Sequence, residues 1–132
     1  MDFASIRVIT GDAPRLVAFY EEVTAVTATW YSPDFAELVL PSCTLAVASD
    51  RTLALHGDGV ARPAANESVI VEFRVADTDA EHERLAALGR TVVQEPTTMP
   101  WGNRSLLLRD PDGNLVNLFT PVTEAARRRL ER

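Results

Sequence analysis

The side chains best suited to covalent or acid–base chemistry in this chain are one cysteine and two histidines. A Cys–His pair would supply an activated nucleophile if the fold brought the two side chains within hydrogen-bond reach. Cys43 follows a turn-forming Pro41-Ser42 and opens a β-prone segment, a setting typical of a small buried residue. We expect His56 to be solvated in a linker and His82 to be a structural residue at the edge of a helix. The spacing therefore supports no Cys–His nucleophile.

The carboxylates with the clearest local role lie in the segment Asp110-Pro111-Asp112-Gly113-Asn114. Pro111 presets φ at the first corner of a tight turn, and Gly113 tolerates the positive φ that other residues resist. The two aspartates can accept hydrogen bonds from neighbouring backbone N–H groups and close the turn. Because the apolar runs Ser105–Leu108 and Leu115–Phe119 flank this segment, we predict a β-hairpin.

Composition limits the classes of partner. The chain has 132 residues, is 46% hydrophobic and 24% charged, and carries a formal charge of −6. These values predict one globular domain, or two small halves that share a core. The negative charge argues against nucleic acid, because phosphate binding needs a clustered basic face. The basic cluster formed by Arg127–Arg129 and Arg132 alternates with Glu124 and Glu131, which predicts the solvated face of a short helix.

The sequence also predicts a cytoplasmic protein that does not enter membranes. No apolar stretch approaches the roughly 20 residues needed to cross a bilayer, and the N-terminus lacks a basic segment followed by an apolar run. A single cysteine cannot form an internal disulfide.

The first half of the chain reads as one strand, one helix and three further strands. Asp12 is placed to cap the helix, Pro14 stands in its first turn, and an apolar stripe follows at helical spacing. The stripe consists of Leu16, Phe19, Tyr20 and Val23. The predicted strands are Ser5–Thr10, Ala28–Tyr31, Phe35–Leu40 and Thr44–Ala48.

The second half repeats this order, and an internal repeat of this kind indicates a fold built from two similar modules. Asp77 or Asp79 caps a helix that runs through Leu88, and Gly89 stops it. The predicted strands are Ser68–Val75, Thr91–Gln94 and the two arms of the hairpin. We therefore expect a first βαβββ module over residues 1–49, a linker or lid over 50–67, a second module over 68–122 and a helical tail over 123–132.

The ordered motifs resemble those of the vicinal oxygen chelate superfamily, which includes glyoxalase I, extradiol dioxygenases and bleomycin-resistance proteins. The resemblance covers almost the entire chain and rests on Ile6-Arg7-Val8, Asp12, Phe19-Tyr20, Phe73–Asp77, Leu85–Gly89, Pro100-Trp101-Gly102 and Asp110–Asn114. It implies an α+β fold of two tandem βαβββ modules forming a curved sheet cleft, with a short C-terminal helix and, in most members, a homodimer.

The resemblance also implies where a metal would bind in most members. The ligands come from the first strand and a late strand of each module, and are normally His, Gln or Glu. The matching positions here hold Ser5, Glu37, Ile70 and Asn117. Isoleucine cannot coordinate a metal, and hydroxyl and amide oxygens are weak donors without more carboxylates. The chain is therefore similar to metal-free members, and we expect no metal and no cofactor.

Alternation along the strands predicts which side chains line the cleft. If Ile70 faces it, so do Glu72 and Arg74, whereas Val71, Phe73 and Val75 pack on the helix. The predicted ligand-binding set is Ser5, Arg7, Phe35, Glu37, Ile70, Glu72, Arg74, Trp101 and Asn117. Within it, Glu37 can pair with Arg7 or Arg74, and Trp101 and Trp30 are either contact surfaces or packed residues.

Two functions remain open at this point. The first is a non-catalytic protein that binds a small organic ligand, as the bleomycin- and mitomycin-binding members do, with no catalytic residue. The alternative is an enzyme of the same superfamily (a lyase, isomerase, thiol transferase or dioxygenase) that uses a divalent metal or Glu37 as general base.

Overall fold

The computed structural model describes residues 1–131, and in it the chain folds as two compact units. The first unit contains Met1–Asn66 together with Asp110–Gly113. The second contains Glu67–Arg109 and the chain from Asn114 onward. Each unit has one four-stranded sheet and one helix packed on it, in the repeated βαβββ order that the sequence predicts.

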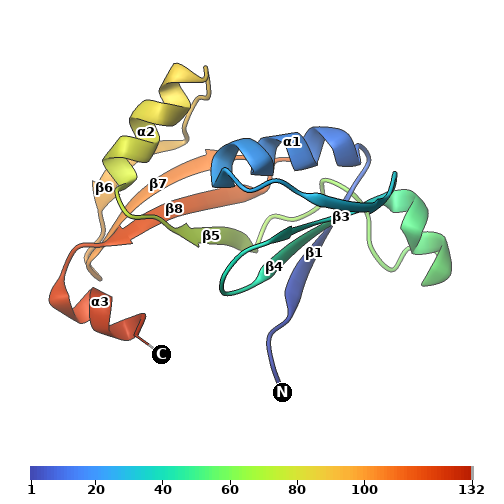
Figure 1. The fold of residues 1–132 in the computed structure, drawn as a ribbon, viewed down its shortest axis with the longest axis horizontal. Helices are drawn as coiled ribbons and strands as arrows, with labels where there is room; N and C mark the ends of the chain where they lie inside the picture. The colour runs from blue at the N-terminus through green and yellow to red at the C-terminus, as the bar shows by residue number, and fades with distance from the viewer. Residues whose placement is uncertain (132) are drawn as a thin grey trace. The chain divides into compact units, whose positions relative to one another are not determined.

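In the first unit, helix α1 lies across one face of its sheet (Figure 1). The elements are β1 (Ser5–Thr10), α1 (Ala13–Thr24), β2 (Thr29–Ser32), β3 (Phe35–Val39) and β4 (Thr44–Ser49). The strand order is β1-β4-β3-β2, with β1 parallel to β4 and the other pairs antiparallel. This crossover arises because α1 separates the first strand from the other three.

Local sequence explains α1. The Asp12 carboxylate caps its first turn by accepting a 3.1 Å hydrogen bond from the Arg15 N–H, which satisfies a donor that the helix cannot. All four residues of the predicted apolar stripe are buried. Phe19 and Tyr20 pack edge to face, with ring centroids 5.1 Å apart, and Leu38 and Val47 of the sheet are fully buried beneath the helix.

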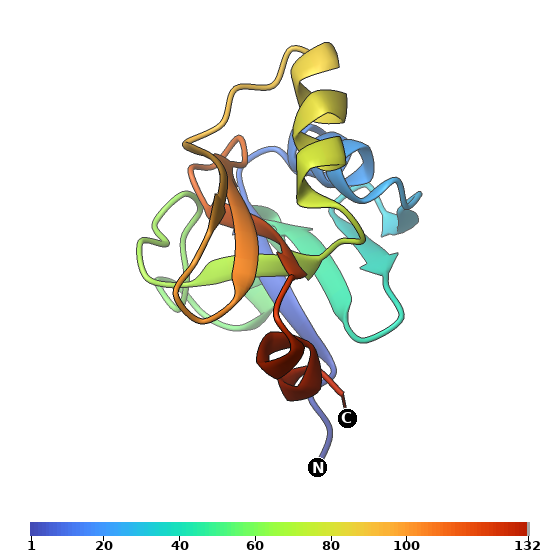
Figure 2. The same cartoon turned by 90° about the vertical axis from the view of Figure 1, so that its left-hand side faces the viewer.

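The second unit repeats this arrangement with the order β5-β8-β7-β6. Its elements are β5 (Ile70–Arg74), α2 (Thr78–Ala87), β6 (Gln94–Thr98), β7 (Asn103–Arg109), β8 (Leu115–Pro121) and the short α3 (Glu124–Arg129). Helix α2 packs on β6, β7 and β8, and Figure 2 shows α3 beside the end of β8. The short C-terminal helix is therefore present, as predicted.

The structure resolves which aspartate caps α2. Asp77 accepts a 3.1 Å hydrogen bond from the Ala80 N–H, whereas Asp79 lies within the first turn and pairs with Arg104. Gly89 follows the helix with a φ of 78°, as predicted for the residue that stops it.

The predicted strand over 91–94 is wrong. The edge strand β6 begins at Gln94 and ends at Thr98. It contains Pro96, which has no N–H and is normally excluded from strands. An edge strand tolerates proline because one side of its backbone needs no partner, and the register against β7 shifts between Gln94 and Thr97.

Part of the segment predicted as a linker is helical. A 3₁₀-helix, η1, spans Asp50–Leu55, and Ser49 caps it by accepting a hydrogen bond from the Arg51 N–H. Arg51 also forms an ion pair with Asp34 at 2.5 Å. This pair ties η1 to the turn between β2 and β3.

The predicted hairpin turn forms between β7 and β8. The Gly113 N–H donates to the Asp110 carbonyl at 3.0 Å, and the Asp112 N–H donates to Asp110 Oδ1 at 2.9 Å. Gly113 has a φ of 84°, a conformation that L side chains resist. The arms of the hairpin extend further than predicted, to Asn103 and Pro121.

Candidate functional site

Glu72 and Asn117 lie opposite each other on neighbouring strands of the second unit. Asn117 Nδ2 donates a 2.7 Å hydrogen bond to Glu72 Oε2. Side chains alternate along a strand, and Val71 is 8% exposed whereas Ile70 is 46% exposed. The Glu72–Asn117 pair therefore projects from the sheet face that α2 leaves uncovered, on the same side as Ile70, as the sequence predicts.

One polar atom of this pair has no partner. Asn117 is only 8% exposed, and its Oδ1 accepts no hydrogen bond from any described residue. The carboxylate of Glu72 can only accept, so the amide must turn its NH₂ toward it and its oxygen away. Leaving a buried acceptor unpaired costs about 1–3 kcal/mol. An N–H or O–H group from a bound molecule or from water would satisfy it.

Apolar side chains border the pair along the same face. Register places the row Ile70–Leu115 on one side of it and Phe119 on the other, and Leu107 lies next to Asn117 on β7. Arg74, opposite Phe119, adds a cation at the end of β5. Apolar surface around a few fixed polar groups is the usual composition of a small-molecule site.

The uncovered face of the first unit carries a second polar row. Pairing places Arg7, Ala46 and Glu37 side by side on β1, β4 and β3. His56 is exposed, as predicted. It also contacts the sheet, because Arg7 Nη2 lies 3.4 Å from His56 Nε2, just beyond η1. Among the residues that the structure describes, no ion pair joins Glu37 to Arg7, contrary to one of the predicted alternatives.

The other predicted residues of the first unit flank this row. Ser5 is exposed at the start of β1 opposite Thr44. Phe35 is half-buried opposite Ala48, and its ring lies 5.9 Å from that of Tyr31. Both have the strand parity of Arg7 and Glu37 and therefore share their face.

The register revises which residues of the two repeats correspond. In the second unit Asn117 lies on β8 opposite Glu72. Glu72 is two residues after Ile70. In the first unit the residue on β4 opposite Arg7, the second residue after Ser5, is Ala46. Glu37 lies one strand further, where the second unit has Leu107. The late-strand counterpart of Asn117 is thus Ala46, a distinction that spacing in sequence did not reveal.

These positions do not fit a metal. They offer a hydroxyl at Ser5, a methyl group at Ala46, hydrocarbon at Ile70 and an amide at Asn117, whose NH₂ is bonded to Glu72. Divalent ions are held by several carboxylate, imidazole or thiolate donors. Over residues 1–131, no group of three or more His, Cys, Asp or Glu side chains is arranged to hold a metal ion.

The Pro-Trp-Gly loop is anchored to α3 through its backbone. Arg129 Nη2 donates to the Trp101 carbonyl at 2.6 Å. Gly102 has a φ of 93°, and a Cβ there would lie 2.1 Å from Thr123 Oγ1. The Trp101 side chain is 58% exposed, so the loop holds a large aromatic surface outside the core. Trp30, on edge strand β2, is also exposed.

Cys43 and His82, considered above as reactive side chains, are both partly buried. Cys43 Sγ lies 3.5 Å from the Thr44 carbonyl oxygen and is partly buried. His82 is half-buried on α2.

Comparison with known proteins shows the family. The sequence model of the Glyoxalase/Bleomycin resistance protein/Dioxygenase superfamily matches residues 2–118. Together with the two βαβββ units, this match shows that the chain belongs to that superfamily, the vicinal oxygen chelate fold. A comparison with curated proteins found no match. No helix within the described residues is both long and apolar enough to cross a bilayer.

Solved structures share the fold. A glyoxalase/bleomycin resistance protein/dioxygenase family enzyme from Burkholderia phytofirmans PsJN aligns with a TM-score of 0.80 at 18% identity, covering 92% of this chain and 100% of that one. A glyoxalase/bleomycin resistance protein/dioxygenase from Nocardioides gives 0.78 at 22% identity, with 94% and 85% coverage. A lactoylglutathione lyase from Agrobacterium tumefaciens gives 0.72 at 20% identity, with 89% and 92% coverage.

Proposed function

We propose that this protein binds a small organic molecule without a catalytic metal, through the sheet faces that its helices leave uncovered. The observation that carries the proposal is the buried Asn117 Oδ1, which lies beside the Glu72 carboxylate and has no hydrogen-bond partner among the described residues. Asn117 Oδ1 and the Glu72 carboxylate can both accept hydrogen bonds from a ligand, because the NH₂ of Asn117 already donates to Glu72. A ligand that donates N–H or O–H groups would satisfy them.

A second amide oxygen supports the proposal that this face binds a hydrogen-bond donor. Asn103 Oδ1 is buried without a partner in the described part of the chain. Asn103 has the same strand parity as Leu107, which lies beside Asn117, so it shares their face. Unpaired buried acceptors are uncommon in native proteins, and two on one face favour a surface that receives hydrogen-bond donors.

The remaining surface suits a flat ligand. Ile70, Leu115 and Phe119 supply apolar area on the face of the pair. Arg74 and the exposed ring of Trp101 add to this surface in the second unit. Ser5, Arg7, Phe35 and Glu37 form a candidate surface of their own on the first unit. Aromatic or antibiotic-like natural products that carry N–H groups are the expected class.

Tryptophan fluorescence tests the proposal. Quenching of Trp101 and Trp30 is titrated with a panel of flat natural products that carry N–H donors. We expect at least one Kd below about 100 μM, and at least tenfold weaker binding by Asn117→Leu. The control Glu95→Gln changes an exposed residue of edge strand β6 and should bind as the unmodified protein does. Absence of binding across the panel would count against the proposal, as would equal affinity of the Asn117→Leu variant.

Metal analysis of the purified protein is the second test. We expect substoichiometric Zn²⁺, Ni²⁺, Mn²⁺ and Fe²⁺, and ligand affinity that a chelator does not change. One equivalent of any of these ions, removed by chelator together with binding, would contradict a metal-free site.

A metal-independent enzyme remains the second candidate, favoured by Glu37. This carboxylate is half-buried beside Ala46, whose methyl group leaves space for a substrate proton to approach a general base. If lyase, isomerase or thiol-transfer activity is detected, Glu37→Gln should abolish turnover while substrate binding persists. Unchanged turnover would exclude Glu37 as the base.

Assembly and location complete the proposal. We infer a homodimer in the cytoplasm, from the superfamily's usual assembly and from the single cysteine. Light scattering coupled to size-exclusion chromatography tests the dimer, and a mass of 14.5 kDa, that of one chain, would contradict it.

A further inference from the structure

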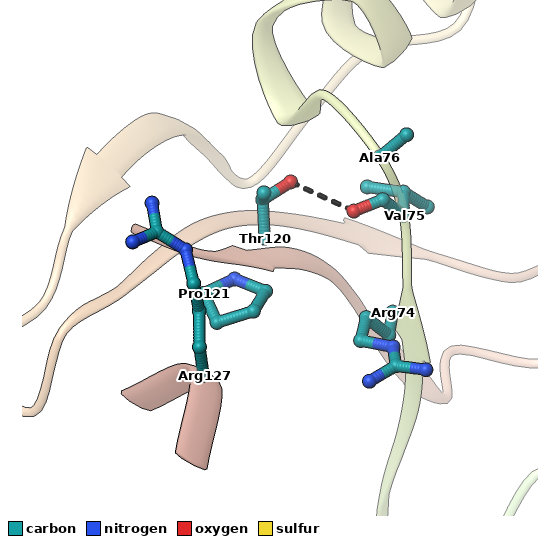
Figure 3. Close-up of a pocket in the computed structure, with 6 residues that line it drawn as sticks. All are labelled: Arg74, Val75, Ala76, Thr120, Pro121 and Arg127. Atoms are coloured by element: carbon teal, nitrogen blue, oxygen red, sulfur yellow. Dashed lines mark hydrogen bonds between the residues drawn. The ribbon is translucent and has the colours of Figure 1, made fainter. Parts of the chain in front are cut away.

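The second unit contains an open hollow where the end of β5 meets the end of β8 and α3 (Figure 3). Its volume is about 430 Å³, which falls in the usual range for small-molecule sites. The lining residues are Arg74, Val75, Ala76, Thr120, Pro121 and Arg127. Figure 3 shows Arg74 and Arg127 on opposite sides of Pro121. Two cations thus border one hollow, and none of its described lining residues carries a carboxylate.

Neither of these two arginines forms an ion pair with a described residue, whereas four other arginines do. Arg51, Arg84, Arg104 and Arg128 each form an ion pair with an aspartate or glutamate. Arg127 Nη2 makes only a 3.3 Å hydrogen bond to the Val122 carbonyl, and no ion pair of Arg74 occurs among residues 1–131. The chain has a formal charge of −6. Two arginines without an ion-pair partner beside the same hollow favour the binding of an anionic ligand.

The floor of the hollow is held rigidly. Thr120 Oγ1 donates to the Val75 carbonyl at 3.0 Å and accepts from the Thr78 N–H at 3.1 Å. The Thr78 hydroxyl in turn donates to the Arg104 carbonyl at 2.9 Å. Because this network ties β5, α2, β7 and β8 together, the backbone beneath Arg74 need not reorganise on binding.

The opposite wall is anchored as well. Ala126 of α3 is fully buried, and Thr123 caps the helix by accepting from the Ala126 N–H at 3.2 Å. Arg127 is the next residue after Ala126, so its backbone is held in place. Its side chain is exposed and can change rotamer. A guanidinium group matches the two oxygens of a carboxylate or phosphate by parallel hydrogen bonds.

We propose that this hollow binds the oxyanion of a small organic molecule, a carboxylate or a phosphate, between Arg74 and Arg127. Val75 and Pro121 offer apolar contact for the body that carries the anion. The hollow shares Arg74 with the surface proposed above, but Asn117 does not line it. It recognises the opposite chemistry, an anion where Asn117 would accept from a donor. It stands whether or not the function proposed above is correct.

The test uses two probes, inorganic phosphate and benzoate, titrated separately at constant ionic strength. Chemical shifts of the arginine Nε–H groups are followed by NMR in the full chain. We expect saturable shifts at Arg74 and Arg127 with a Kd of about 1–10 mM, as suits one isolated oxyanion group. Tighter benzoate binding would identify a carboxylate on an apolar body, and tighter phosphate binding a phosphorylated ligand, and either result supports the site.

Variants decide whether the hollow is responsible. Arg74→Gln and Arg127→Gln should each weaken probe binding at least tenfold. The matched control is Arg128→Gln on the same helix, whose side chain pairs with Glu124 outside the hollow, and it should bind within about twofold of the unmodified chain. Shifts that do not saturate by about 50 mM probe, or equal weakening by Arg128→Gln, would overturn the site. Asn117→Leu should leave phosphate binding unchanged, which separates this result from the proposed function.

Discussion

The Tyr20 hydroxyl donates a 2.6 Å hydrogen bond to Asp110 Oδ2, and both groups are buried. These residues are 90 positions apart, yet they belong to the same compact unit. Asp110 Oδ1 accepts from the Asp112 N–H in the same turn. One carboxylate thus closes the turn and, through its other oxygen, ties the turn to α1.

Tyr20→Phe tests this contact through both stability and pH. Burial, and then the hydrogen bond to Asp110, raise the pKa of the Tyr20 phenol well above its ordinary value. The unfolded chain ionises this group above about pH 10 while the folded chain does not, so the stabilisation is present below that pH and declines above it. We expect the variant to lose about 1–3 kcal/mol at neutral pH and to be less sensitive to alkali. Urea denaturation at neutral pH and near pH 10.5 measures both effects.

Tyr31→Phe is the control, because Tyr31 is 63% exposed. It should leave the unfolding free energy and its alkaline decline unchanged. A Tyr20→Phe variant as stable as the unmodified protein would show that the buried bond contributes nothing.

Asp79→Asn should lower stability at neutral pH but not in acid. Arg104 donates to both oxygens of Asp79, at 2.8 and 2.9 Å, and this hydrogen bonding lowers the pKa of the Asp79 carboxyl below its ordinary value. The resulting stabilisation is therefore present above about pH 4 and is lost as pH falls through the lower folded value. We expect the variant to have a lower urea midpoint at pH 7, with the difference vanishing near pH 2.

The pair is solvent-exposed, so the difference should be small and should shrink in high salt. Glu95→Gln, an exposed change on the edge strand of the same sheet, should show no such pH dependence. An equal deficit of Asp79→Asn at both pH values would contradict the ionic origin.

Gly102→Ala should destabilise the second unit. The residue has a φ of 93°, and an added Cβ would lie 2.1 Å from Thr123 Oγ1 and 3.0 Å from Ala126 Cβ. Both the left-handed backbone and the clash oppose the substitution, at a combined cost of about 2–4 kcal/mol. Thermal unfolding should show a lower midpoint, and the fluorescence of Trp101 should shift as its loop leaves α3.

Gly89→Ala is the comparison, since Gly89 has a φ of 78° but no atom within 4 Å of an added Cβ. It isolates the backbone cost of about 1 kcal/mol. If the two variants were equally stable, the loop would not be packed against Thr123 as described.

Asn117→Leu should separate stability from binding. The substitution removes a buried acceptor that has no partner and leaves Glu72, which is exposed, to water. We expect the unfolding free energy to stay within about 1 kcal/mol of the unmodified value or to rise, although ligand binding weakens at least tenfold. Urea denaturation beside the fluorescence titration measures both. A loss of several kcal/mol would assign Asn117 to structural support alone.

Some features of the site were predictable because they depend on local rules. Alternation along β5 places Glu72 on the uncovered face, since period two is a property of any strand. The correspondence of Asn117 with Ala46 was not predictable in the same way. It depends on which strands become neighbours, and Glu37 sits on β3, one strand away from the matching position.

The predicted strand over 91–94 failed for a related reason. Val92-Val93 has high β propensity, but pairing with β7 selects the segment from Gln94 to Thr98, including Pro96. Propensity describes isolated segments, whereas a sheet selects the segment that its neighbour can pair.

The amino-acid sequence alone determined the cap at Asp12, the turn around Gly113 and the repeated order of elements, because each arises from contacts between residues close along the chain; it left the cap of α2 open between Asp77 and Asp79. Only the tertiary structure decided that Asn117 Oδ1 has no partner among residues 1–131, that Tyr20 binds Asp110, and that Arg74 and Arg127 border one hollow. Tyr20 and Asp110 are 90 positions apart, and Arg74 and Arg127 also lie far apart along the chain. Local preferences carry no information about such distant pairs or about what surrounds a buried atom.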